Sequence, residues 1–361
     1  MQDIGGALLG RVGYRVVRKP GMSWKGWERI RIETGEGDVG AEAIAPVIVS
    51  ASRSTDIPAF YGSWFMKRLE EGYAKWENPF NRRAQYVSFA RARLIAFWTK
   101  NPAPFLSHLA EMDKTGLSYY FLFTLNDYER ENLEPNVPPL EKRIRIFEEL
   151  SDRIGKGRVV WRFDPLILSD SITPGLLLEK IEAIGDRLFR KTRRMVISFV
   201  DIEKYARVKR NLQASGFSDV RQFSIPEMET LSAGLRELNK EWGLEISACG
   251  EAHDLSRFGI WKGQCINYDL MVEEFGHDED LMKFLHPDPG MSREAAIRWL
   301  KDPGQRGRCG CVASKDIGQY NTCMHLCTYC YANSSPNLVQ RNYEHFIWKS
   351  RVSGFGESIL D

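Results

Sequence analysis

The chain of 361 residues lacks the apolar runs of a membrane protein, because no stretch reaches the roughly 18 apolar residues that a spanning helix needs. Its start also lacks the charged region and long apolar core of a secretory leader. The sequence also lacks an excess of one charge, because 50 Lys and Arg against 48 Asp and Glu leave a formal net charge of +2. A protein that coats a polyanion would carry a much larger positive charge. We therefore expect a cytoplasmic protein that makes no membrane contact.

Histidines and phosphate-binding glycine motifs are also scarce. The six histidines form neither an H-x-x-x-H nor an H-E-x-x-H group, so the sequence does not favour a catalytic metal held by histidines. It contains no P-loop and no Rossmann glycine fingerprint, and no pattern marks a nucleophilic serine or a Cys–His pair. The cysteines remain as the main chemical signal.

From Pro46 onward, short β-branched or aromatic runs alternate with amphipathic helical segments. The predicted strands are 46–52, 94–99, 119–125, 158–163, 194–200 and 244–250, with weaker ones at 263–269 and 310–316. The helix candidates, several of which open with Pro and stop at Gly, are 57–72, 104–116, 139–155, 174–186 and 226–243. This alternation predicts an α/β fold with parallel strands, and the number of units favours a TIM-type (β/α) barrel.

Three parts are expected along the chain. Residues 1–45 contain two alternating stretches that predict a small β-hairpin extension. Residues 46–345 would form the barrel with a C-terminal cysteine loop, and residues 346–361 a tail. The Pro- and Asn-rich stretch 126–140 predicts an ordered flap over the barrel mouth.

Polar residues follow each of the six clear strands. A barrel would gather them at one mouth, where they could orient a cosubstrate or substrate, whereas an open doubly wound sheet would concentrate them at its switch point. The ordinary alternative for each is a loop residue or helix cap. The candidates for this catalytic mouth are Arg53, Lys100, Asn126, Arg162, Asp164 and Asp201.

Five of the seven cysteines fall between residues 309 and 330. Cys323, Cys327 and Cys330 have the spacing C-x3-C-x2-C, which can bind three irons of a [4Fe–4S] cluster and leave the fourth iron open. The alternative is a zinc site completed by another cysteine or by His325.

The other four cysteines are enough for a second centre whose ligands all come from the protein. These are Cys249, Cys265, Cys309 and Cys311. Either an auxiliary iron–sulfur cluster or a zinc ion would suit four thiolates. The ordinary alternative is that they are small buried hydrophobic residues.

The cysteine motif, with Tyr329 just before its last cysteine, resembles the cluster motif of radical S-adenosylmethionine enzymes. The continuation Cys330-Tyr331-Ala332-Asn333 is similar to the spore photoproduct lyase-like branch. SASRSTDIPAFY, NPFN, FWTKNP and LEPNVP further resemble a domain-of-unknown-function family whose cysteine motif lies near the C-terminus, over about residues 46–345.

The resemblance implies a [4Fe–4S] cluster on Cys323, Cys327 and Cys330, with S-adenosylmethionine bound to its open iron. Tyr329 would lie beside the adenine. Glu251, in Cys249-Gly250-Glu251, would stand in for the Gly-Gly-Glu segment that holds the methionine amine. An electron from a donor such as flavodoxin or ferredoxin would cleave the sulfonium and start radical chemistry on an unidentified substrate. Because the cysteine loop follows the last strand, the implied barrel is circularly permuted.

Two other functions remain open from the sequence. One is nucleic-acid repair or modification, suggested by the lyase-like motif and by interleaved cations and aromatics near the N-terminus. Those residues are Arg11, Arg15, Arg18, Trp24, Lys25, Trp27, Arg29 and Arg31. The other is a non-catalytic binding protein in which zinc stabilises the cysteine-rich end.

Overall fold

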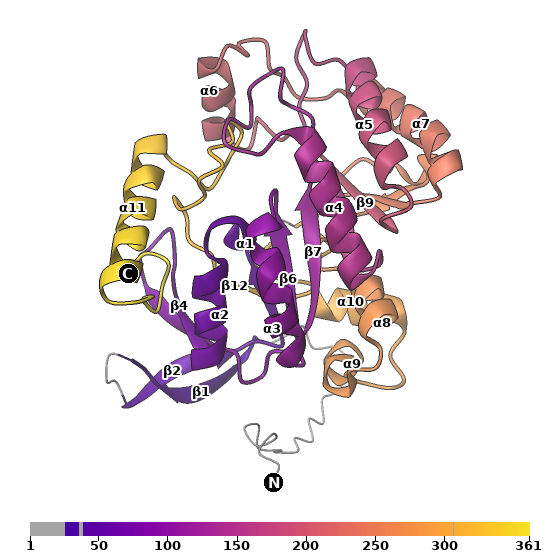
Figure 1. Cartoon of the computed structure of the whole chain (residues 1–361). Helices are drawn as coiled ribbons and strands as arrows, with labels where there is room; N and C mark the ends of the chain where they lie inside the picture. The colour runs from indigo at the N-terminus through magenta and orange to yellow at the C-terminus, as the bar shows by residue number, and fades with distance from the viewer. Residues whose placement is uncertain (1–25, 36–38, 306) are drawn as a thin grey trace.

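A computed structural model describes residues 26–35, 39–305 and 307–361 (Figure 1). The helices are α1 (Ile57–Phe60), α2 (Gly62–Glu71), α3 (Leu109–Lys114), α4 (Leu140–Ile154), α5 (Pro174–Leu188), α6 (Ala206–Ala214), α7 (Ile225–Trp242), α8 (Tyr268–Phe275), α9 (Glu279–Leu285), α10 (Arg293–Leu300) and α11 (Pro336–Val352). The strands are β1 (Glu28–Glu33), β2 (Val39–Ala45), β3 (Ile48–Ala51), β4 (Tyr73–Glu77), β5 (Ala84–Ser88), β6 (Leu94–Thr99), β7 (Ser118–Thr124), β8 (Val159–Leu166), β9 (Arg194–Phe199), β10 (Glu245–Ala248), β11 (Ile260–Lys262) and β12 (Lys315–Asp316).

The main sheet has eight strands in the order β11-β10-β9-β8-β7-β6-β3-β12, all parallel. It includes all six clear strands predicted from the sequence. The weaker predictions are shifted: the strand near 263–269 is β11, just before that segment, and the one near 310–316 is only the short β12. Although β12 comes last in the chain, it pairs with β3, the first strand of this sheet.

The predicted TIM-type barrel is wrong, whether permuted or not. Within the described part of the chain, β11 pairs only with β10 and β12 only with β3, so the sheet stays open. The segment between these two edge strands supplies the physical reason. It forms α8, α9 and α10, which pack on one face of the sheet, whereas the interior of a closed barrel is filled by the strands' own side chains.

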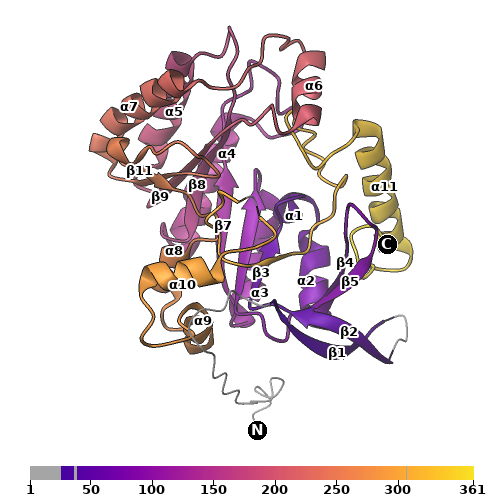
Figure 2. The same cartoon turned by 180° about the vertical axis from the view of Figure 1, so that it is seen from behind.

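Both faces of the sheet are buried, as parallel sheets usually are. Side chains such as Phe97, Phe121 and Trp161 pack on the helices α1 to α5 and α7, and Figure 1 shows α1 to α4 in front of the strands. The opposite face, with Tyr120 and Val160, packs on α8 to α10, which Figure 2 shows from behind. The result is a three-layer α/β fold.

The N-terminal hairpin is built into a second, mixed sheet with the order β1-β2-β5-β4. β1 and β2 pair antiparallel, and β2 pairs parallel with β5. Of the two alternating stretches expected to form the hairpin, 13–17 lies outside the described residues and 27–34 contains β1, whose partner is β2 and not the first stretch. The predicted domain boundaries at residues 45 and 345 stay predictions.

No described helix is long and apolar enough to cross a membrane.

Candidate functional site

The loop that carries Cys323, Cys327 and Cys330 follows β12 and lies at the carboxyl ends of the parallel strands. Three hydrogen bonds to neighbouring segments fix its course. The Tyr61 hydroxyl donates to the Thr322 carbonyl over 2.6 Å, the Asn136 amide to the Met324 carbonyl over 2.8 Å, and the Thr328 N–H to the Leu133 carbonyl over 2.9 Å.

Two of these partners belong to the stretch 126–140, which has no helix or strand before α4 begins. Its Leu133 and Asn136 lie directly against the cysteine loop. The predicted flap is therefore an ordered segment that packs on the three-cysteine motif.

The three thiols lie close enough to influence one another electrostatically. Burial raises the pKa of Cys323 well above its usual value, that of Cys327 to about 12, and that of Cys330 as well. A bound metal reverses this effect, since a coordinating thiol gives up its proton to the metal's charge. The site is therefore suited to thiolates only when they are compensated by a cation or a cluster.

His325 lies inside the motif, but its ring nitrogens are already engaged. Nε2 is 2.8 Å from a carboxylate oxygen of Asp56, and Nδ1 is 3.4 Å from the Asn136 carbonyl. The same carboxylate of Asp56 accepts the Lys100 N–H over 2.7 Å and the Ala59 N–H over 2.9 Å. Neither His325 nor Asp56 is placed as a free fourth ligand.

Tyr329 belongs to a buried polar network next to the thiols. Its hydroxyl donates to Glu134, lies 2.9 Å from Lys100 Nζ and accepts the Asn126 amide over 3.1 Å. Lys100 Nζ donates to Glu134 over 2.7 Å. Burial would raise the pKa of Glu134, but the charges of Lys100 and Arg143 outweigh it and lower that pKa.

The sequence predicted Lys100, Asn126 and Tyr329 as site residues but missed Glu134. The available signal was an acidic residue inside the predicted flap. Tyr329 is only 9% exposed, and its hydroxyl is directed into this network.

Arg162 and Asp164 form a second polar group along β8. The guanidinium of Arg162 donates to Asp164 and also to the Cys265 sulfur over 3.3 Å. Asp164 accepts the Ser198 hydroxyl, and its backbone N–H donates to Asn126 Oδ1 over 2.9 Å. Asn126 thereby connects the Tyr329 network to Arg162.

Arg53 connects the surroundings of the two cysteine groups. Its carbonyl accepts the hydroxyl of Tyr331, the residue after Cys330, over 2.7 Å. Its guanidinium lies over the Trp98 ring and donates to the Ser314 hydroxyl over 2.8 Å. Burial alone would lower the pKa of Arg53. The negative charges of nearby groups outweigh burial and raise that pKa above its usual value; these groups are Cys311, Asp316, Asp302 and Cys265.

The remaining four cysteines lie together. Cys249 follows β10, and Cys265 follows β11. The Cys265 thiol donates to the Cys249 sulfur over 3.6 Å, and its backbone N–H donates to the Cys311 sulfur over 3.1 Å. Cys309 interacts with the thiols of Cys249 and Cys311, which lower its pKa to about 3. These four residues are called the four-cysteine group below.

Two predicted site residues do not join these networks. Asp201 accepts the Lys204 N–H over 3.1 Å at the turn after β9. Glu251 accepts the N–H groups of Ala252 and His253 over 2.6 and 3.0 Å. Each carboxylate caps its own turn, which is the ordinary alternative considered for such residues.

Among the described residues, no three His, Cys, Asp or Glu side chains are already arranged as metal ligands. Both cysteine groups would therefore need side-chain rotation to bind a metal. For the three-cysteine motif, the donor set of three thiols fits a [4Fe–4S] cluster with one open iron. All seven cysteines are described, four of them form the other group, and His325 is engaged, so within the described ranges the three thiols have no fourth cysteine and no free histidine of their loop beside them.

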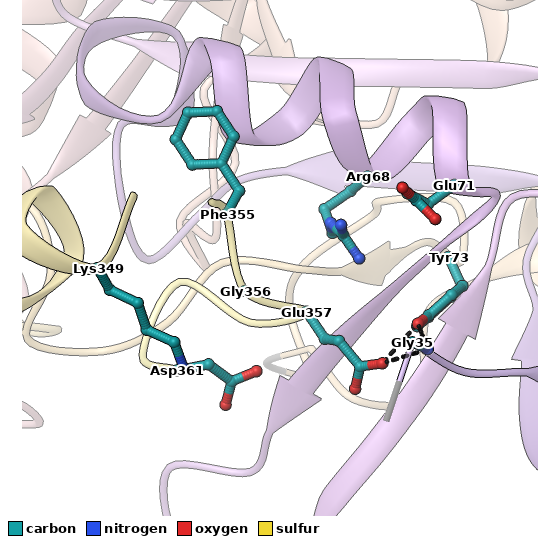
Figure 3. A pocket seen from close by; sticks show the side chains of 9 residues that line it. All are labelled: Gly35, Arg68, Glu71, Tyr73, Lys349, Phe355, Gly356, Glu357 and Asp361. Carbon is teal, nitrogen blue, oxygen red and sulfur yellow. Dashed lines mark hydrogen bonds between the residues drawn. The ribbon is translucent and has the colours of Figure 1, made fainter. Parts of the chain in front are cut away.

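A surface pocket of about 240 Å³ lies elsewhere, where residues 355–361 approach α2 and β4 (Figure 3). In it, Glu357 accepts the Gly35 N–H over 3.1 Å and the Tyr73 hydroxyl over 2.5 Å. Arg68 and Lys349 face Glu71, Glu357 and Asp361 around the pocket, so its lining has no dominant charge. No cysteine lines it.

The basic and aromatic residues considered for nucleic-acid binding are only partly described. Arg11, Arg15, Arg18, Trp24 and Lys25 lie outside the described residues. Arg29 pairs with Glu42 over 2.5 Å, Arg31 lies on the same strand β1, and Trp27 stacks on Phe284 at 5.7 Å. These contacts favour a hairpin packed on the body of the protein.

The family model for a domain of unknown function, DUF1848, matches residues 48–332, which is most of the chain. The chain belongs to this family. The match spans the whole main sheet, the four-cysteine group and the three-cysteine motif. No curated protein and no solved structure matches the chain.

Proposed function

We propose that this DUF1848 protein is an iron–sulfur enzyme that uses S-adenosylmethionine for radical chemistry. Cys323, Cys327 and Cys330 would hold a [4Fe–4S] cluster with one open iron. When bound, the cluster would supply the electron that cleaves the sulfonium C–S bond of S-adenosylmethionine and releases a carbon radical.

The observation that carries the proposal is the isolation of three thiols in one loop. The other four cysteines form a group of their own, and His325 is bonded to Asp56. A closed structural zinc site needs four protein ligands, whereas a cluster with an open iron needs three protein thiolates.

The position of β12 adds support. In the enzymes that the motif resembles, the cysteine loop usually follows the first strand. Here the loop follows β12, the last strand in the chain. β12 is an edge strand of the main sheet, and its neighbour is β3, the first strand of that sheet along the chain. This pairing keeps the loop beside the first strand of the main sheet although it comes late in the chain.

The surrounding residues would hold the loop and balance its charge. Lys100 places a cation near the sulfur of Cys327 and bonds the hydroxyl of Tyr329. Glu134 neutralises Lys100, while Asn126 connects this pair to β8. Residues 126–140 cover the loop and would exclude water from a radical formed there.

The test is anaerobic reconstitution with iron and sulfide, followed by reduction in the presence of S-adenosylmethionine. The proposal expects about four irons in the loop of each chain and release of 5′-deoxyadenosine or a 3-amino-3-carboxypropyl fragment. The variant C323A/C327A/C330A should lose this iron and the cleavage. Ser63→Ala on α2, away from the loop, is the matched control and should retain both. A folded protein that binds no iron in this loop would refute the proposal.

A further inference from the structure

The four-cysteine group suggests a metal centre separate from the proposed function. Cys249 and Cys265 follow neighbouring parallel strands, while Cys309 and Cys311 come from the segment after α10. Cys265 and Cys311 are 46 positions apart in the chain, yet the backbone N–H of the first bonds the sulfur of the second. Three separate stretches thus bring four thiols to one place.

Each of the four thiols interacts with others of the group. Cys249 interacts with Cys265 and Cys309, and Cys311 interacts with Cys309 and Cys265. Cys265, Cys309 and Cys311 are at most 6% exposed, and Cys249 is half-buried. The four sulfurs therefore lie near one another in a shielded part of the fold, and Cys311 also influences Cys249 electrostatically.

The spacing of the sulfurs distinguishes a single ion from a cluster. The Sγ atoms of Cys249 and Cys265 are 3.6 Å apart. A tetrahedral zinc ion with Zn–S bonds of about 2.3 Å separates its sulfurs by about 3.8 Å. A cubane spreads its four thiolates further apart, because each binds a different iron. The distance between Cys249 and Cys265 is therefore short enough for both to bind one ion after side-chain rotation of the group, and too short for two ligands of one cubane.

Two guanidinium groups lie beside the sulfurs and would stabilise thiolates once a metal is bound. The buried guanidinium of Arg162 donates to the Cys265 sulfur over 3.3 Å, and the guanidinium of Arg53 lies near Cys311. Arg162 is 7% exposed, and its Nε has no hydrogen-bond partner among the residues that the structure describes. A neutral thiol is a weak acceptor for such donors, whereas a metal-bound thiolate is a strong one, and donors to the ligand atoms commonly support metal sites.

We propose that Cys249, Cys265, Cys309 and Cys311 bind one zinc ion, which fastens the segment of α8, α9 and α10 to the sheet. This segment covers a face of the sheet through residues such as Tyr268, Leu281 and Leu300. Both of its ends reach the ion, Cys265 before α8 and the Cys309–Cys311 pair after α10. The site takes no part in cleaving S-adenosylmethionine, so it stands even if the proposed function fails.

The test is metal analysis of the full chain and of two variants purified without added metal. C323A/C327A/C330A keeps only the four-cysteine group and should retain one zinc per chain. Cys309→Ser should lose that zinc. Cobalt exchanged into the triple variant should show thiolate-to-cobalt charge transfer and the d–d bands of a tetrahedral ion. This optical signature tests the site even if Cys309→Ser fails to fold.

Alkylation of the folded triple variant gives a second readout. The four thiols should be protected while zinc is bound and should react after a chelator removes it, as peptide mass spectrometry would show. The inference is overturned if the folded triple variant binds neither zinc nor cobalt. It is also overturned if that variant takes up a cluster with acid-labile sulfide, or if zinc is lost from the triple variant but kept by Cys309→Ser.

Discussion

At the residue scale, Lys315 has an unusual environment. Its ammonium group lies 3.3 Å from the centre of the Trp76 ring, and burial lowers its pKa from 10.5 to about 8, partly offset by Asp316. Below pH 8 the buried ammonium is charged in the folded state, which lowers the free energy of unfolding. Between pH 8 and 10.5 the unfolded chain keeps a proton that the folded chain has lost, so this residue makes stability rise with pH.

Lys315→Met should therefore stabilise the protein at pH 7, by about 2 kcal/mol once partial exposure is allowed for. The advantage over the wild type should shrink as the pH rises from 8 to 10.5. Urea unfolding at several pH values measures it. Lys114→Met, on the exposed end of α3, is the control for removing a charge. An advantage that is independent of pH would contradict the assignment.

The pair of Lys100 and Glu134 is the other prediction at this scale. Glu134 is buried, and Arg143 lies 3.6 Å away as a second cation. Lys100→Met should destabilise the fold by about 2 kcal/mol, because it removes the closer partner of a buried carboxylate. Adding Glu134→Gln should recover part of this loss, and denaturant unfolding of the two single variants and the double variant measures the coupling. Independent, additive effects would show that the pair is not coupled.

At the element scale, the long helices were predictable because their boundary signals are local. α7 begins with a capping box in which Ser224 accepts the Glu227 N–H and Glu227 accepts the Ser224 N–H. Pro226 and Gly243 mark its two ends in the sequence. The segment of α8 to α10 carries comparable caps, but the face of the sheet that it covers depends on contacts distant in the chain. The sequence pattern therefore did not indicate that this segment would take the place of a barrel interior.

Ser224→Ala should destabilise the protein by about 1 kcal/mol, because it removes the side-chain oxygen that caps α7. Ser224→Asp, which preserves an acceptor, is the matched control and should stay close to the wild type. Thermal unfolding compares the two. Equal losses in both variants would show that the hydroxyl acts through something other than the cap.

The packing of α5 on α7 gives a second prediction for these helices. A Cβ atom on Gly185 would lie 2.3 Å from the Trp242 ring, which is held by a 2.9 Å hydrogen bond to Asp186. Gly185→Ala should therefore cost about 1–3 kcal/mol despite the better helix propensity of alanine. Gly234→Ala meets only the mobile end of Leu178 and should cost less. Unfolding curves in which both variants are equally stable would contradict this difference.

At the scale of the whole molecule, the sequence predicted the parallel α/β order and the grouping of polar strand ends, but not the open sheet. Lys100, Asn126 and Tyr329 do meet, because they follow neighbouring strands or lie in the loop after β12. Asp201 and Glu251 cap their own turns instead, since a single carboxylate after a strand satisfies nearby N–H groups first. Glu134 was missed because a loop has no periodicity that would place its side chain.

The four-cysteine group leads to a prediction about the stability of the molecule as a whole. If one zinc ion holds both ends of the segment from Cys265 to Cys311, its removal frees that segment while α4, α5 and α7 keep their own packing on the opposite face. Chelation should then raise amide hydrogen exchange in α8, α9 and α10 and leave those three helices protected. Uniform loss of protection would mean that the two faces unfold together, and unchanged exchange would mean that no bound ion supports the segment.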